Sequence, residues 1–147
     1  MSVIVGFDHH PASMVALQCA GDLAAALGTH VHVVHVTSVS DGTLATHGGG
    51  EPTTAVTSDQ VRVAGALDGL DVQWTFHRRD DGDPAHALLE VASQYDASII
   101  VVGRPEDGIG AALGHMVTGA VARTLIRRSP LPVLVVPNSE RRERSPW

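Results

Sequence analysis

Residues 98–137 constrain the fold more than any other stretch, because strand-type and helix-type patterns alternate within them. Ser98–Val102 is a short apolar run rich in β-branched residues, as is typical of a parallel strand buried on both faces. A glycine-rich loop follows, and apolar residues then recur at helical spacing until Pro130. Pro132–Val136 is a second apolar strand. The stretch therefore predicts a strand, a helix and a parallel strand, joined by a right-handed crossover.

The loop of this unit is the first candidate binding site. It leaves the carboxyl end of a parallel strand, where open α/β sheets bind their ligands. It contains Gly103, Gly108, Gly110 and Gly114, and glycines allow backbone amides to approach a phosphate beside a helix N-terminus. A flexible connection that needs glycine only for its turns is the alternative interpretation. The spacing from Gly108 has one residue too many for a dinucleotide fingerprint, and the chain has no lysine for a P-loop.

The earlier part of the chain also alternates between strands and helices. Gly28 is typical of a helix end, and Asp83 followed by Pro84 is typical of a helix N-cap and first position. The expected elements are a strand at 3–7, a helix at 11–27, a strand at 30–36, a helix at 54–67, a strand at 71–78 and a helix from Pro84. This order predicts an α/β fold with a parallel sheet.

Periodicity also predicts which side chains face the core. In the first helix, the stripe expected to be buried is Ala16, Ala20, Leu23 and Leu27. In the strand at 71–78, the apolar face is Val72, Trp74 and Phe76. Polar residues, among them His77, alternate with these three, so we expect a half-exposed strand at an edge of the sheet.

Length and composition limit the class of protein. The chain has 147 residues, of which 44% are hydrophobic, and this suits one globular domain. The net charge of −6 argues against a general nucleic-acid or membrane surface, and no apolar run approaches the about 20 residues of a membrane span. The N-terminus lacks the pattern of a signal peptide and Cys19 has no partner for a disulfide, so we expect a cytoplasmic protein. Residues 138–147 lack periodicity and are expected to be a disordered tail after a domain at 1–137.

Histidines occur near two predicted strand ends. His30 and His32 share one face of their strand, whereas His35 points to the other. With His9 and His10 at a neighbouring strand end, these positions allow a zinc site as one interpretation. Neither a cysteine pair nor an HExxH motif accompanies them, so we expect no metal site.

The motifs, taken in order, resemble those of the universal stress protein family. That family has the loop signature G-x2-G-x9-G-S/T, followed by a helix and a last strand similar to Pro132-Val-Leu-Val-Val136. Gly103 matches the first glycine of the signature and Gly119 the last. Val3-Ile-Val-Gly-Phe-Asp8 resembles the opening strand, and Gly82-Asp83-Pro84 resembles the turn before the third helix. The resemblance covers nearly the whole chain.

The resemblance implies a doubly wound five-stranded parallel sheet in the order 3-2-1-4-5, with helices on both faces. It also implies a site for ATP, accompanied by Mg²⁺, with Asp8 and Val36 around the adenosine and the 103–120 loop around the phosphates. The binding residues that it implies are Phe7, Asp8, His9, Val36, Gly103, Arg104, Gly108, Gly119, Ala120 and Val121. Finally, it implies a homodimer in which Pro132–Val136 pairs with its copy.

Several residues depart from the family pattern. Glu106 stands in place of the second loop glycine, and Ala120 in place of the hydroxyl residue after the last glycine. The segment between Gly103 and Gly119 is also longer than in the signature. Asp8 has two interpretations: its carboxylate either contacts a ligand or only shapes a turn. Two functions therefore remain: an adenine-nucleotide-binding protein of the stress response with weakened affinity for ATP, or a homodimeric interaction module that binds no nucleotide.

An enzyme is not expected. The sequence has no G-x-S-x-G motif, no Walker loop and no acid–base pair placed by spacing. Slow ATP hydrolysis, which the resemblance allows, would still need a catalytic base that no motif of this chain supplies.

Overall fold

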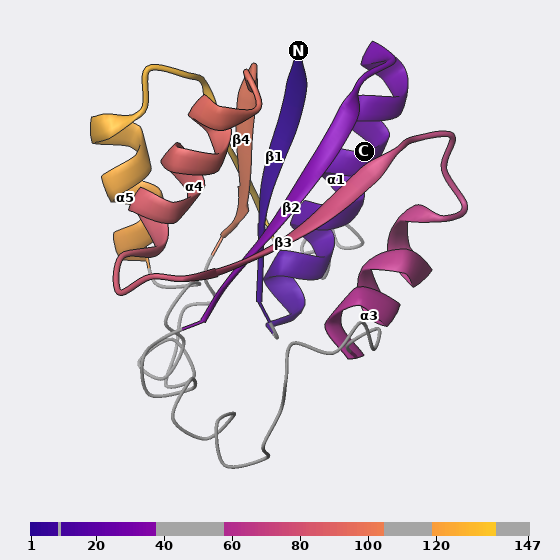
Figure 1. Cartoon of the computed structure of the whole chain (residues 1–147), viewed down its shortest axis with the longest axis horizontal. Helices are drawn as coiled ribbons and strands as arrows, with labels where there is room; N and C mark the ends of the chain where they lie inside the picture. Colours follow the sequence, from indigo (N-terminus) through magenta and orange to yellow (C-terminus); the bar gives the residue numbers. More distant parts are fainter. Residues whose placement is uncertain (9, 38–57, 105–118, 138–147) are drawn as a thin grey trace, which may run out of the picture.

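The computed structural model describes residues 1–8, 10–37, 58–104 and 119–137 (Figure 1). Most of the candidate phosphate loop and the expected tail lie outside these residues. Five parallel strands form one sheet in the order β3-β2-β1-β4-β5, which confirms the predicted doubly wound topology. The strands are β1 (Ser2–Phe7), β2 (His30–Thr37), β3 (Trp74–Asp80), β4 (Ile99–Gly103) and β5 (Val133–Val136).

Strand β1 is the centre of the sheet, with β2 on one side and β4 on the other. All 6 of its residues are buried. Val5 pairs with Val33 of β2 and with Val101 of β4. A strand that is covered on both faces needs apolar side chains at every position, and this is why the sequence of β1 does not alternate.

The helices cover both faces of the sheet (Figure 1). Helices α1 (Pro11–Leu27) and α3 (Ser58–Leu67) pack on one face, and α4 (Pro84–Gln94) and α5 (Gly119–Arg128) pack on the other. The odd-numbered residues of β1 belong to the core under α1 and α3, whereas Ile4 belongs to the core under α4 and α5. No helix among the described residues is long and apolar enough to cross a membrane.

The buried face of α1 differs from the predicted stripe. Leu27 is 51% exposed, and Leu23 is only partly buried. The residues that face the core are Ala12, Ser13, Ala16, Leu17, Ala20, Gly21 and Ala24. Most of these are small, and small side chains allow the helix to lie close to the sheet. The close approach turns the alanine face of α1 inward and leaves Leu27, in the last turn, facing solvent.

Strand boundaries differ from the predicted ones by a few residues. Strand β3 begins at Trp74 rather than at Asp71, and β4 includes Gly103 but not Ser98. Strand β5 begins after Pro132, which has no backbone N–H with which to join a ladder.

The polar face of β3 is less exposed than the alternation predicted. His77 is only 8% exposed. The ring of Tyr95, at the end of α4, lies beside it with the centroids 4.9 Å apart. A residue at an edge strand is therefore buried by a side chain that is distant in sequence, and periodicity cannot report such a contact.

Gly103, the last residue of β4, packs against the first turn of α1. A Cβ atom at this position would lie 2.5 Å from the carbonyl oxygen of Ala12 and 2.7 Å from its carbonyl carbon. Both are backbone atoms, which cannot move unless α1 moves with them. The packing of α1 on β4 therefore requires glycine here, whether or not Gly103 contacts a ligand.

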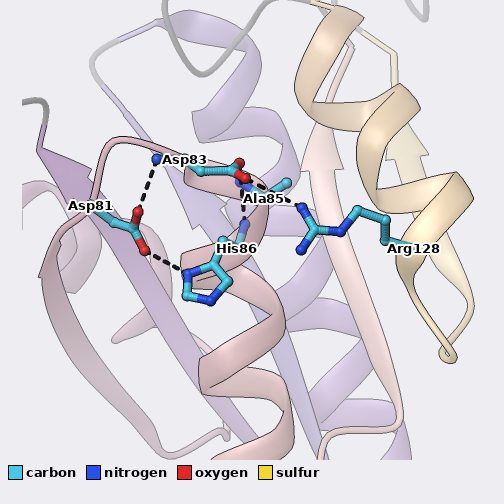
Figure 2. A network of polar contacts seen from close by, with 5 residues as sticks. All are labelled: Asp81, Asp83, Ala85, His86 and Arg128. Carbon is cyan, nitrogen blue, oxygen red and sulfur yellow. Dashed lines mark hydrogen bonds and ion pairs between the residues drawn. The ribbon is translucent and has the colours of Figure 1, made fainter.

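Asp83 caps α4 as predicted (Figure 2). Its Oδ1 accepts hydrogen bonds from the backbone N–H groups of Ala85, at 3.1 Å, and His86, at 3.3 Å. Pro84, next along the chain, occupies the start of the helix. Oδ2 of Asp83 lies 3.3 Å from Nη1 of Arg128, at the end of α5, but both side chains are about half exposed, so this ion pair adds little stability.

Asp83→Ala is expected to lower the free energy of unfolding by about 1 kcal/mol, because two amides of the first turn of α4 lose their acceptor. Asp83→Asn is the matched control, since asparagine keeps the capping oxygen and loses the charge that faces Arg128. Urea unfolding of the two variants separates the contributions. Equal losses would contradict the account, because the ion pair and not the cap would then be the stabilising contact.

Gly103→Ala is expected to lower the free energy of unfolding by about 1–3 kcal/mol, the usual cost of forcing extra volume into a packed site. Gly65→Ala is the control, because a Cβ at Gly65 meets nothing within 4 Å. Gly65 lies inside α3, so its replacement should raise stability by about 0.5–1 kcal/mol. A Gly103→Ala protein as stable as the native chain would show that α1 can move away from β4 at no cost.

Candidate functional site

Strands β1, β2 and β4 end side by side at the carboxyl edge of the sheet (Figure 1). Phe7 is paired with His35, so Asp8 lies level with Val36. The register of β1 with β4 places Gly103 level with Phe7. Residues predicted for the binding site from three separate segments are therefore brought together at one edge.

The amino-terminal end of α5 lies at the same edge, because the helix runs back from the end of β4 to the start of β5. Ala120 is exposed there, and Val121 is buried. The dipole of α5 would favour an anion near Gly119, the first residue of this helix. His9 and Gly108, the other predicted site residues, lie outside the described residues.

The carboxylate of Asp8 shapes the turn from β1 into α1. Its Oδ1 accepts a hydrogen bond from the N–H of His10 at 2.8 Å, and Nδ1 of His10 lies 3.3 Å from the same oxygen. The hydroxyl of Ser13 donates to the carbonyl of Asp8 at 2.7 Å and accepts from its N–H at 3.1 Å. Asp8 is only 8% exposed. These contacts are those of a turn carboxylate held in one position, and a fixed carboxylate is also what a ribose contact would need.

Arg104 is held differently from the prediction for a phosphate loop. Its backbone N–H donates a 2.7 Å hydrogen bond to the carbonyl of Val136, the last residue of β5. This amide therefore extends the β4–β5 ladder and is not free to bind a phosphate. The side chain of Arg104 is exposed, so only its guanidinium remains available to an anion.

Three predicted site residues contribute their side chains to the core. Phe7 is fully buried, Val36 is 8% exposed and Val121 is 6% exposed. Phe7 belongs to the core under α1 and α3, and the other two belong to the core under α4 and α5. These side chains support the strand ends and the start of α5, so they position a ligand site without offering polar groups to it.

A contact between β2 and α3 was not predicted from the sequence. Nδ1 of His35 donates a hydrogen bond to the carbonyl of Phe7 at 3.0 Å, and its Nε2 lies 3.8 Å from Oδ2 of Asp59. Both side chains are buried. The face of His35, opposite to that of His32, was predicted correctly, but Asp59 carries no sequence signal beyond an acidic residue in a first helical turn. The contact links the start of α3 to the ends of β1 and β2.

Asp81 and His86 form an exposed pair beyond the end of β3 (Figure 2). Nδ1 of His86 lies 2.8 Å from Oδ2 of Asp81. This hydrogen bond lowers the pKa of Asp81 and raises the pKa of His86. Glu90 brings a third ligand atom to within 4.8 Å of the others, but the group is at the surface, where acidic side chains commonly gather without a metal. The expectation of no metal site stays a prediction.

A pocket of about 380 Å³ lies among the described residues, away from the carboxyl edge. It is lined by Leu89, Ala92, Ser93, Asp96, Ala97, Arg128, Pro130 and Leu131, between α4 and the connection from α5 to β5. Its walls are mainly apolar, and Asp96 and Arg128 are the charged residues among those that line it. We therefore place the candidate site at the strand ends and not in this pocket.

Three solved structures share the fold of this chain and are distant from it in sequence. A universal stress protein from Archaeoglobus fulgidus is 21% identical, with a TM-score of 0.68, and the match covers 92% of this chain and 98% of that one. The protein from Archaeoglobus fulgidus in complex with dAMP is 22% identical, with a TM-score of 0.63 and coverage of 92% and 97%. A universal stress protein in complex with cAMP is 24% identical, with a TM-score of 0.61 and coverage of 95% and 98%.

The family of the chain is assigned from its sequence and not from the fold alone. No curated protein sequence matches the chain. The sequence model of the universal stress protein family, however, matches residues 1–137, which include every described strand and helix. The chain therefore belongs to the universal stress protein family.

Proposed function

We propose that this protein binds an adenine nucleotide, ATP with Mg²⁺, at the carboxyl edge of the sheet and acts in a stress response. The observation that carries the proposal is the meeting of Asp8, Val36 and Gly103 beside the start of α5. This is the point of an open α/β sheet at which ligands bind. The solved family members in complex with dAMP and cAMP support the choice of an adenine nucleotide.

In this proposal the strand ends hold the adenosine and the 103–120 loop holds the phosphates. The carboxylate of Asp8, fixed by the N–H of His10, would accept a hydrogen bond from a ribose hydroxyl. The start of α5 would face the phosphates with its positive dipole end. Arg104 would contribute its exposed guanidinium, because its amide is already bonded to Val136.

Two residues of the 103–120 loop favour weak affinity for ATP. Glu106 places a negative charge in the phosphate loop, and Ala120 offers no hydroxyl. A hydrogen bond to a charged group contributes about 1.5–3 kcal/mol, so the missing hydroxyl alone would weaken binding by an order of magnitude or more.

We propose binding rather than catalysis as the activity. Among the described residues, His35 is the buried histidine closest to this edge, and Asp59 lies beside its Nε2. Its Nδ1 donates to the carbonyl of Phe7. Both ring nitrogens are therefore engaged with the protein, and His35 is not placed to take a proton from a water that attacks a phosphate.

A homodimeric interaction module is the second candidate function, and the open edge of β5 favours it. Strand β5 pairs with β4 on one side and with no other described strand. Val133, Leu134 and Val135 are all partly exposed. An apolar edge strand needs a cover, and a second copy of the same strand would supply it.

Glu106→Gly combined with Ala120→Ser is expected to tighten ATP binding by about 2 kcal/mol, or about thirtyfold, by removing a repulsive charge and adding a charge-assisted hydrogen bond. Titration calorimetry with ATP and Mg²⁺ measures both proteins. Asp96→Asn is the control for net charge, because Asp96 lies at the opposite edge and its φ of 52° suits asparagine.

Two outcomes would count against this proposal. If the native chain binds at low micromolar concentration and the double variant binds no better, the account of Glu106 and Ala120 is wrong. If neither protein binds, and protein purified without added ligand carries no nucleotide by mass spectrometry, the interaction module is the better function.

The dimer is tested separately, by sedimentation at micromolar concentration. The native chain should sediment at twice 15.4 kDa, and Val135→Lys should sediment as a monomer, because a lysine on an edge strand opposes pairing. Val61→Lys, on an exposed position of α3 that is 59% accessible, is the matched control and should remain a dimer. A native monomer would refute the pairing of β5.

A further inference from the structure

Four aromatic rings form a cluster on the face of β2 and β3 that α4 covers. His30 and His32 come from β2, His77 from β3 and Tyr95 from the end of α4. The ring of His32 stacks on Tyr95 with the centroids 4.2 Å apart, and lies 5.1 Å from the ring of His77 and 4.6 Å from that of His30. His32 is 7% exposed and His77 is 8% exposed. The predicted nucleotide site lies elsewhere, at the carboxyl ends of the strands.

The two buried histidines form a direct hydrogen bond. Nδ1 of His32 lies 2.9 Å from Nε2 of His77. Only one hydrogen fits between these nitrogens, so one ring donates and the other accepts. A first added proton would place a positive charge in this buried site. A second would leave two N–H groups facing each other and break the bond.

The groups around the pair oppose its protonation. Burial, followed by the charges of His30 and His77, lowers the pKa of His32 from 6.5 to about 4. Burial, followed by Arg79 and His30, also lowers the pKa of His77. The other side chain in contact with both histidines is the ring of Tyr95, at the end of α4.

Asp96, which follows Tyr95, lies 4.0 Å from the amino group of Met1, and both groups are mostly exposed. Arg79 donates to Oε1 of Gln94 at 3.2 Å. Among the described residues, no carboxylate raises the pKa of His32 or of His77.

The cluster holds one end of α4 on the sheet. Tyr95 is the C-cap of α4, and its N–H donates to the carbonyl of Val91 at 3.1 Å. The carbonyl of Tyr95 accepts a 3.0 Å hydrogen bond from the hydroxyl of Ser2, at the start of β1. Loss of the contacts of the Tyr95 ring with His32 and His77 would therefore loosen the end of α4 from β2 and β3 and leave the hydrogen bond to Ser2 as its link to β1.

We propose that the His32–His77 pair is an acid-sensitive switch, which holds Tyr95 and the end of α4 on the sheet when neutral and releases them when protonated. The direction of the pH effect on stability follows from the number of protons that each state binds. Between about pH 6.5 and pH 4 the unfolded or opened state binds more protons than the closed state, so stability falls as the pH falls through this range. The proposal is independent of nucleotide binding.

Tyr95 makes the switch measurable in the native protein, because it is the only tyrosine of the chain. Its ring resonances in an NMR spectrum should stay at shifted positions at about pH 7 and move to the positions of a free tyrosine as His32 titrates, below about pH 5. The ring protons of the histidines, followed in the same titration, should show His32 and His77 protonating well below the exposed His86. His86 is the comparison in this titration, because Asp81 raises its pKa, whereas the pKa values of His32 and His77 are lowered.

The variant that tests the cause is His32→Asn with His77→Gln. Asparagine and glutamine keep a polar nitrogen or oxygen near Nδ1 and Nε2 but do not titrate in this range. In the native protein the unfolding equilibrium constant should rise about tenfold to thirtyfold between about pH 7 and pH 5 from His32 alone, and the double variant should lose this increase. His86→Gln is the matched control and should keep it.

Three results would overturn the proposal. Histidine titrations at the ordinary midpoint for His32 and His77 would show that the pair opens freely at neutral pH. Release of Tyr95 at the same pH in the native protein and in the double variant would place the acid sensitivity in carboxylates. Titration of His32 at low pH without movement of the Tyr95 resonances would show that protonation leaves α4 in place. The first and third need only the native chain, so a variant that does not fold leaves the test intact.

Discussion

The parallel pairing of β1 with β2 and β4 is the contact on which the rest of the structure depends. Every residue of β1 is buried, and its alternate side chains enter the two cores on opposite faces of the sheet. The helix after β1 packs on one face and the helix after β4 packs on the other. The two chain segments that leave neighbouring strands therefore diverge, and an open α/β sheet binds ligands where they do so.

The carboxyl edge of the sheet and the face under α4 carry different chemistry. At the carboxyl edge, polar groups are fixed by contacts with the backbone: Asp8 by the N–H of His10, and His35 by the carbonyl of Phe7. Of these two groups, Asp8 is held ready for a ligand at little further entropic cost, whereas both ring nitrogens of His35 already contact the protein. On the face under α4, the polar groups of His32 and His77 are instead paired with each other and covered by Tyr95. The proposed binding edge and the proposed pH-sensitive contact thus lie in separate places on one sheet.

The sequence predicted the features that depend on local pattern. The apolar run of β1, the cap at Asp83 and the helix end at Gly28 are found where the residue types indicated them. The left-handed backbone of Gly28, with φ of 65°, is a conformation that glycine adopts without strain. The sheet order followed from the resemblance, because periodicity alone does not say which strands are neighbours.

The missed features are contacts between residues distant in the sequence. The burial of His77 depends on Tyr95, and the loss of the Arg104 amide as a ligand depends on the carbonyl of Val136. Gly103 satisfied the family pattern for a phosphate loop, but the structure adds a second reason for glycine, the close approach of Ala12. A residue can therefore match a binding motif and still be required by packing.

The central claim is that an adenine nucleotide binds at the carboxyl edge, and backbone amide shifts on addition of ATP and Mg²⁺ test it most directly. The account predicts that the amides of Asp8, His10 and Val36 shift together and saturate. The amides of Ser2 and Ala97, at the opposite edge, should stay in place. Shifts confined to that opposite edge, or no shifts at any ATP concentration, would contradict the account.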